Sequence, residues 1–356
     1  MDFKVEKLMQ PAIKNFQPYQ AKHYPGVIKM DANENPYPWP KGLREAALGQ
    51  VSFNRYPDSE ASALRDKISG YTGVGPEKIM VGNGSDELIQ ILLMAFGGVG
   101  TKTIMASPTF TMYSLAATYT GGQAVEVPLI NGDTLDIPGL IAAAEDPQAR
   151  AIIICNPNNP TGNCFPLEDI RQVIRGTDKL VIVDEAYYEF SGSTLVGELE
   201  NFPNLVVLRT LSKAFGMAAL RIGYLMTGVA VIDVLARIRQ PYNSNSFSQA
   251  CGTLAFEYLP EFQAQVRDIL AERDKLVGFL QGLELERVYA SDANFILFKP
   301  RNKAKEIFEG LLKQKVLIRY MGNLPVVGET LRVSPGLPEE NLKFMNALVK
   351  TLGGGI

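Results

Sequence analysis

One lysine, Lys213, lies in a sequence setting that could support covalent amine chemistry. It occupies the segment 209–223 (RTLSKAFGMAALRIG), whose apolar residues favour partial burial. Burial lowers the pKa of a lysine and increases the share of neutral amine that Schiff-base formation needs. Thr210, Ser212 and Arg221 add two hydroxyls and a cation nearby, as a bound phosphate would require. A lysine taken alone is usually a solvated surface group, so other motifs must support this role.

A second segment, Gly84-Ser85-Asp86, has the residue types of a phosphate-binding turn. It follows a strand-like run that ends at Val81 and precedes an apolar helical stretch at 88–96. Glycine lets the backbone approach a ligand, and the free N–H groups at a helix start attract anions. A tight turn with a Ser or Asp helix cap is the commoner use of such a sequence.

Two further polar segments follow apolar runs. Residues 155–162 (CNPNNPTG) contain Asn159 in a loop stiffened by prolines, which could present an amide to a ligand or simply form a turn. Asp184 begins the segment DEAY, which ends at Tyr187. A carboxylate at a buried strand end needs a cation or strong donors, although a turn or cap aspartate is the ordinary alternative.

The elements that position these residues are short, continuously apolar runs. They are residues 78–81, 102–106, 151–155, 180–183 and 205–208. Continuous hydrophobicity is typical of parallel strands buried on both faces, and ligands of such sheets lie at the carboxyl ends of the strands. The pattern predicts an α/β domain with a mostly parallel central sheet covered by helices.

The pattern changes after about residue 245. A long amphipathic segment at 261–283 is followed by strand candidates at 294–299 and 316–320, which indicates a smaller α+β lobe. The Pro- and aromatic-rich start of the chain cannot fold alone and is expected to pack on that lobe. The predicted division is a large domain at 31–244 and a small domain made of 1–30 and 245–356.

Composition excludes several classes of function. The 356 residues are 46% hydrophobic and 21% charged, and the net charge of −3 disfavours nucleic-acid binding. The sequence contains no run of 18 apolar residues, the length that would indicate a membrane span. Cys155, Cys164 and Cys251 show no CxxC spacing, which fits a reducing cytoplasm. A single histidine, His23, argues against a His-rich metal site and against Ser-His-Asp or Cys-His catalysis, and we expect no metal.

In their order along the chain, these segments resemble the fold-type I pyridoxal-phosphate aminotransferases of classes I and II. The resemblance covers at least residues 31–334. Four further segments are similar to the histidinol-phosphate aminotransferase subfamily: DANENPY (31–37), RYP (55–57), SPTFTMY (107–113) and LRVS (331–334).

The resemblance implies pyridoxal 5'-phosphate as the cofactor, held by Lys213 as a Schiff base. Lys213 would also move the proton during transfer. Asp184 would pair with the pyridine nitrogen, Asn159 and Tyr187 would hydrogen-bond the ring oxygen, and Phe110 would stack on the ring.

The remaining cofactor contacts would surround the phosphate. They are expected from Gly84, Ser85, Asp86, Thr210, Ser212 and Arg221. Tyr56 would reach the phosphate of the neighbouring subunit, which implies a homodimer. A tyrosine packed in its own Arg-Tyr-Pro turn is the alternative.

Substrate binding is assigned by the resemblance to four residues. Arg332 would hold the anionic end of the substrate, since its planar fork suits a carboxylate or a phosphate. Arg319 would be a second anion-binding position, although a surface salt bridge is an equal alternative. Tyr19 and Asn33 would line the entrance.

The implied partners are a small amino donor and a 2-oxo acid acceptor. The expected reaction transfers the amino group of L-histidinol phosphate to 2-oxoglutarate. A threonine-phosphate decarboxylase and an aromatic or broad-specificity aminotransferase are alternatives. A non-catalytic regulator is disfavoured because every cofactor residue is present.

Overall fold

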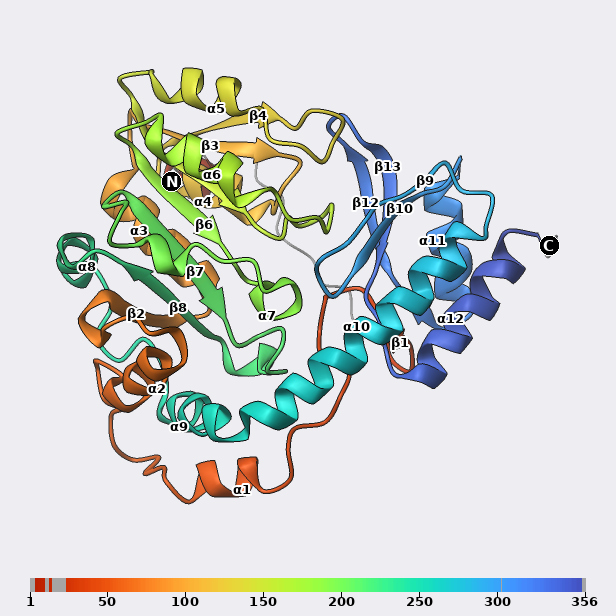
Figure 1. Ribbon diagram of the computed structural model, residues 1–356, viewed down its shortest axis with the longest axis horizontal. Coiled ribbons are helices and arrows are strands. Elements are labelled where there is room, and N and C mark those ends of the chain that lie inside the picture. The colour runs from red at the N-terminus through yellow and green to blue at the C-terminus, as the bar shows by residue number, and fades with distance from the viewer. Residues whose placement is uncertain (1–3, 10–12, 15–23, 302, 354–356) are drawn as a thin grey trace.

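The computed structural model describes residues 4–9, 13–14, 24–301 and 303–353. A seven-stranded sheet forms the centre of the larger lobe (Figure 1), with the strand order β2-β8-β7-β6-β5-β3-β4. Its strands are β2 (Ile79–Asn83), β3 (Lys102–Ser107), β4 (Gln123–Pro128), β5 (Ala149–Cys155), β6 (Leu180–Asp184), β7 (Leu205–Thr210) and β8 (Ile222–Thr227).

The sheet is parallel except at one strand. β3 pairs in parallel with β4 and β5, and β6 pairs in parallel with β5 and β7. β8 is antiparallel to both of its neighbours, β2 and β7. The carboxyl ends of the other strands therefore share one edge with the amino end of β8, which brings the segment before Ile222 to that edge. The prediction of a mostly parallel sheet is confirmed, although the apolar runs did not reveal β4 and β8.

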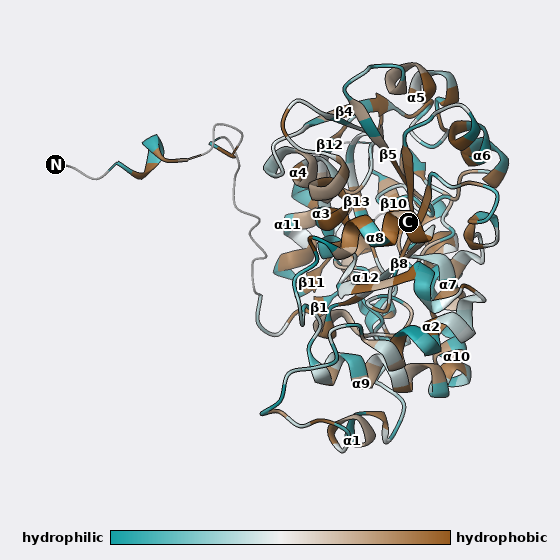
Figure 2. Cartoon of the chain, turned by 90° about the vertical axis from the view of Figure 1, so that its left-hand side faces the viewer, coloured by the Kyte–Doolittle hydropathy of each residue, from teal (hydrophilic) through white to brown (hydrophobic). Residues whose placement is uncertain are grey.

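Helices cover both faces of this sheet. They are α1 (Leu43–Leu48), α2 (Ser62–Thr72), α3 (Ser85–Phe96), α4 (Met112–Tyr119), α5 (Ile137–Ala144), α6 (Leu167–Arg175), α7 (Tyr188–Ser191), α8 (Val229–Ala236) and α9 (Ser246–Ala255). Successive residues of β6 enter opposite cores, with Val181 and Val183 in one and Ile182 in the other. Burial on both faces is the reason for the continuous hydrophobicity of these strands, which Figure 2 shows along β5 and β8.

The smaller lobe contains two further sheets. A four-stranded antiparallel sheet has the order β12-β13-β10-β9, and a two-stranded parallel sheet joins β1 to β11. Their bounds are β1 (Ile28–Lys29), β9 (Arg287–Val288), β10 (Ile296–Lys299), β11 (Val316–Leu317), β12 (Arg319–Leu324) and β13 (Gly328–Val333). The helices are α10 (Leu259–Gln281), α11 (Ala304–Lys313) and α12 (Pro338–Thr351). Elsewhere along the described chain, 3-10 turns span Val5–Lys7, Pro76–Lys78, Val196–Glu198, Ala218–Leu220 and Phe256–Tyr258.

α10 links the two lobes, because it contacts α7 of the larger lobe as well as β10 and α12 of the smaller one (Figure 1). Residues 28–30 pack on the smaller lobe, since β1 pairs with β11 and Met30 enters the core of that lobe, whereas the turn Val5–Lys7 has no buried residue. Domain boundaries at residues 31 and 245 stay a prediction. Within the described ranges, the helices lack the combined length and apolarity that crossing a bilayer requires.

Candidate active site

A cavity of about 490 Å³ opens at the carboxyl edge of the central sheet. It lies where the strand ends meet the N-terminal segment and the sheet of the smaller lobe. Its lining comprises Asp31, Ala32, Asn33, Ser85, Asp86, Thr109, Phe110, Thr111, Met112, Tyr113, Cys155, Asn159, Asp184, Ala186, Tyr187, Thr210, Ser212, Lys213, Arg221, Arg319, Met321 and Arg332. Most residues that the sequence pattern singled out therefore face one space.

Lys213 follows the carboxyl end of β7 and extends into this cavity. Its Nζ donates a hydrogen bond to the carbonyl oxygen of Ala32 at 3.2 Å and lies 5.9 Å from the centroid of the Tyr187 ring. Burial, and secondarily the charge of Arg332, lowers the pKa of Lys213 to about 8. Both protonation states of the amine are thus accessible near neutral pH, as proton transfer requires.

Asp184 ends β6 at the base of the cavity and is 3% exposed. Its Oδ2 accepts a hydrogen bond from the Tyr113 hydroxyl at 2.7 Å, and its Oδ1 accepts one from the Ala186 N–H at 3.0 Å. Burial nevertheless raises the pKa of Asp184 to about 6. A cation facing this carboxylate, such as a protonated pyridine nitrogen, would offset that cost of burial. Tyr113 had no predicted role in the site, although it belongs to the segment SPTFTMY.

The Tyr187 hydroxyl is held by two amide groups. It accepts hydrogen bonds from Asn33 Nδ2 at 2.9 Å and from Asn159 Nδ2 at 3.3 Å. Burial raises the pKa of Tyr187, so the phenol keeps its proton. Because both acceptor positions of the oxygen are used, its proton is available for an oxygen atom in the cavity, such as a ring oxygen.

The opposite end of the cavity is shaped for close approach of a ligand. Arg221 adopts a positive φ of 54° before β8, and its Nη2 lies 3.0 Å from Oδ2 of Asp86. A Cβ on Gly84 would lie 2.6 Å from that Nη2, and one on Gly223 would collide with the backbone nitrogen of Ser85. Because Gly84 and Gly223 have no side chains, space remains beside Arg221 at the start of α3. The backbone N–H groups there suit a phosphate.

Thr210, Ser212 and Phe110 complete the predicted cofactor wall. Thr210 Oγ1 donates to the carbonyl oxygen of Ile222 at 2.9 Å and accepts from the Ser212 N–H at 3.1 Å, which fixes the turn before Lys213. Phe110 packs edge-on against Tyr113, with the ring centroids 5.5 Å apart. The residues thus fit the ring, the ring oxygen and the phosphate of pyridoxal 5'-phosphate.

Two arginines of the smaller lobe face the same space. Arg319 and Arg332 are register partners on β12 and β13. Arg332 donates to Oδ1 of Asn159 at 2.6 Å and to the carbonyl oxygen of Asp31 at 2.9 Å. Asn33, which we expect at the entrance, lines the cavity but is 1% exposed and donates to the Tyr187 hydroxyl.

One predicted residue, Tyr56, is not brought into this cavity by its own chain. Tyr56 is 81% exposed and stacks on Tyr242, with centroids 4.6 Å apart. It is absent from the cavity lining of its own chain. Tyr19 and His23 lie outside the described residues.

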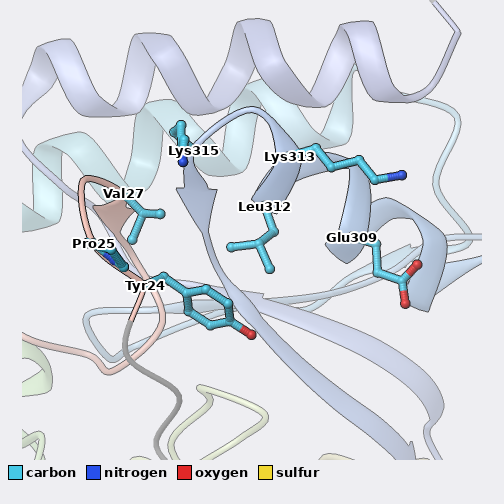
Figure 3. A pocket seen from close by; sticks show the side chains of 7 residues that line it. All are labelled: Tyr24, Pro25, Val27, Glu309, Leu312, Lys313 and Lys315. Carbon is cyan, nitrogen blue, oxygen red and sulfur yellow. The ribbon is translucent and has the colours of Figure 1, made fainter.

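A second cavity, of about 430 Å³, lies in the smaller lobe (Figure 3). Its walls are Tyr24, Pro25, Val27, Glu309, Leu312, Lys313 and Lys315. Among the described residues, its lining shares no member with the cavity that contains Lys213. We therefore assign the predicted chemistry to the cavity at the sheet edge.

The chain belongs to the aminotransferase class I and II family, which matches residues 25–348. It is 46% identical over 354 residues to a histidinol-phosphate aminotransferase of Desulfitobacterium hafniense (strain DSM 10664 / DCB-2), with 98% of each chain covered. It is 40% identical over 349 residues to histidinol-phosphate aminotransferase 1 of Carboxydothermus hydrogenoformans, covering 97% of this chain and 99% of the relative.

Solved structures agree with this placement. The histidinol-phosphate aminotransferase from Clostridium acetobutylicum is 25% identical with a TM-score of 0.84, and the match covers 92% of this chain and 99% of that one. The enzyme from Sinorhizobium meliloti, solved in complex with pyridoxal-5'-phosphate, is 22% identical with a TM-score of 0.88, covering 97% and 98%. The predicted family, fold and class of pyridoxal-phosphate-dependent aminotransferase are confirmed.

Proposed function

We propose that this enzyme transfers the amino group of L-histidinol phosphate to 2-oxoglutarate, yielding imidazole acetol phosphate and L-glutamate. The identity of 46% to a histidinol-phosphate aminotransferase over nearly the whole chain supports this substrate. The observation that carries the proposal is the pair Arg319 and Arg332, which faces the same cavity as Lys213. Two guanidinium groups beside a reactive amine suit substrates with a phosphate or a second carboxylate.

Pyridoxal 5'-phosphate, when bound, supplies an electron-withdrawing ring that makes the carbon bearing the substrate nitrogen more acidic. Lys213 is the group that takes and returns the proton. With a pKa of about 8, roughly one tenth of its amine is neutral at pH 7. Its hydrogen bond to Ala32 and its position near the Tyr187 ring hold the amine at the wall of the cavity.

Asp184 and Tyr187 hold the two polar positions of the ring in this proposal. Asp184 keeps a proton on the pyridine nitrogen, because an anion at 3% exposure needs a cation opposite it. Tyr187 donates its proton to the ring oxygen while Asn33 and Asn159 hold its lone pairs. Gly84, Ser85 and Arg221 bind the phosphate.

Arg332 binds the anionic end of both substrates in turn. Arg332 donates a hydrogen bond to the side-chain oxygen of Asn159, and the amide nitrogen of Asn159 donates to the Tyr187 hydroxyl. The substrate site is thereby connected to the residues at the ring oxygen. Arg319, on the neighbouring strand, adds the second cation that a doubly charged phosphate or a dicarboxylate needs.

We further propose a homodimer in which Tyr56 completes the partner's phosphate site. Tyr56 and Tyr242 are both exposed on the single chain, 81% and 45%, and form a stacked aromatic pair. Tyrosine pairs of this kind are typical of protein interfaces. The free cysteines agree with a reducing compartment, and we place the enzyme in the cytoplasm.

A donor panel tests the substrate. Purified enzyme with cofactor is mixed with histidinol phosphate, phenylalanine or threonine phosphate, and the absorbance change of the bound cofactor reports each amino transfer. Histidinol phosphate should react with the highest kcat/KM, and no carbon dioxide should form. A preference for phenylalanine would support an aromatic aminotransferase. Carbon dioxide release from threonine phosphate would support a decarboxylase.

A further inference from the structure

A third cavity, of about 320 Å³, lies behind the loop that carries Lys213. Its lining residues come from α7, α10, the end of α2 and the segment directly after Lys213. Its lining comprises Tyr71, Tyr188, Glu189, Gly192, Ala214, Phe215, Leu259, Phe262, Gln263, Val266, Arg267 and Leu270. No member also lines the cavity of Lys213, so the two are separate spaces.

Aromatic rings form much of this lining. The Phe215 ring meets Tyr71 edge-on with centroids 6.3 Å apart, and it meets the tilted ring of Phe262 at 5.2 Å. Phe215 and Phe262 are each at most 2% exposed, so their positions are set by packing. Rigid rings of this kind favour a flat apolar body, and their faces attract cations.

The lining contains one carboxylate, that of Glu189 on α7. Its Oε1 is buried and has no hydrogen-bond partner among the described residues. Burial raises the pKa of Glu189 to about 7, although the charge of Arg209 and the backbone N–H of Glu189 lower it in part. A buried carboxylate oxygen in this state is a strong acceptor for a ligand with N–H groups.

A buried cation, Arg209, already forms an ion pair with another acid, Glu185. Arg209 is 2% exposed, and its Nε and Nη2 donate to Oε2 of Glu185 at 3.0 and 2.9 Å. Nη2 also donates to Thr194 at 2.7 Å, and the guanidinium lies 3.5 Å from the centroid of the Tyr188 ring. Arg209 therefore donates its hydrogen bonds to Glu185 and Thr194 and acts on Glu189 through its charge.

The second cation of the lining lies on the solvent side. Arg267 and Gln263 are exposed on α10, so water solvates their polar ends. Screening by water weakens the effect of Arg267 on a ligand deeper in the cavity. The charge that such a ligand meets at the inner wall is that of Glu189.

We propose that this cavity binds a small organic cation, whose amidinium, guanidinium or ammonium N–H groups donate to Glu189 while its apolar body packs on Phe215 and Phe262. The volume falls within the ordinary range of small-ligand sites. Ala214 and Phe215 directly follow Lys213, so a bound cation contacts the segment that carries the reactive amine.

Benzamidinium is a suitable probe, because it is flat, cationic and has no hydrogen on the carbon that bears nitrogen, and so cannot donate an amino group. Titration calorimetry on the cofactor-loaded enzyme should detect its binding. Neutral benzamide, which has nearly the same shape, should bind at least about tenfold more weakly. Glu189→Gln should weaken benzamidinium by at least about tenfold, whereas the matched rim variant Arg267→Gln should bind it as tightly or more tightly.

A second variant covers the case in which Glu189→Gln does not fold. Leu270→Trp fills the cavity from the partly exposed side of α10 and should abolish benzamidinium binding without changing the cofactor spectrum. Equal affinities for benzamidinium and benzamide would overturn the proposal. So would undiminished binding to Glu189→Gln or Leu270→Trp, or the absence of binding to the wild-type enzyme at millimolar probe.

Discussion

Removal of the Tyr113 hydroxyl should change the protonation of Asp184 and, through it, the binding of the cofactor. Tyr113 is fully buried, and its hydroxyl donates to Oδ2 of Asp184 at 2.7 Å. This hydrogen bond lowers the pKa of Asp184, whereas burial raises it, and the balance is a pKa of about 6. Tyr113→Phe deletes only the oxygen, so the ring still fills its place in the core.

The magnitude follows from the strength of a hydrogen bond to a charged group, about 1.5–3 kcal/mol. Loss of that stabilisation increases the proton affinity of the carboxylate about tenfold to hundredfold, since 1.4 kcal/mol is a factor of ten. The pKa of Asp184 in Tyr113→Phe should therefore rise from about 6 into the neutral range. Near pH 7 a smaller share of Asp184 is then charged and able to hold a pyridinium nitrogen.

The assay is the dissociation constant of pyridoxal 5'-phosphate, measured from pH 5 to 8 on protein freed of cofactor. A carboxylate that must be ionised supports binding above its pKa and loses that support as the pH falls through it. The decline should begin near pH 6 in the wild type and at a clearly higher pH in Tyr113→Phe. Tyr119→Phe, on the same helix α4, is the matched control and should behave as the wild type. Superimposable profiles for Tyr113→Phe and the wild type would refute the coupling.

Four further outcomes are expected. Lys213→Ala should lose the yellow colour of the bound cofactor and amino transfer while its circular dichroism stays native, and full activity in this variant would contradict the central role of the amine. Arg332→Lys should raise KM about tenfold or more for both substrates at unchanged cofactor affinity, because the planar fork is lost; unaltered KM values would remove the role. Tyr56→Phe should weaken cofactor binding about tenfold, and hybrid dimers with Lys213→Ala should regain the wild-type cofactor affinity at the site that has both Lys213 and the partner's tyrosine; a hybrid whose affinity stays at the Tyr56→Phe value would argue against a shared site. Arg209→Ala should lower the free energy of unfolding by about 3–5 kcal/mol, because it leaves Glu185 buried and unpaired; denaturation midpoints close to the wild type would show that Glu185 finds another partner.

Local patterns in the sequence were sufficient for the central sheet and for the principal cofactor residues. Burial on both faces makes each inner strand continuously apolar, so β3, β5, β6 and β7 are visible without any tertiary information. Polar residues directly after these strands must share the carboxyl edge. Asp184 and Lys213 could therefore be placed together from their position after β6 and β7.

The tertiary structure decided the contacts that depend on strand order and register. β8 enters the sheet antiparallel between β2 and β7, which brings Arg221 to Gly84 and Asp86 across the sheet edge. No local period of the sequence indicates which strands become neighbours.

The long-range contacts around Asp184 and Tyr187 could not be predicted from the sequence either. Tyr113 reaches Asp184 across 71 residues, and Arg332 reaches Asn159 across 173. The resemblance implied Asn33 at the entrance, whereas its side chain is 1% exposed and donates to the Tyr187 hydroxyl. The sequence by itself determined which residues could do chemistry and on which edge they lie, since these depend on local hydrophobic pattern. Only the folded chain decided which of them touch, because register and lobe packing arise from contacts between distant segments.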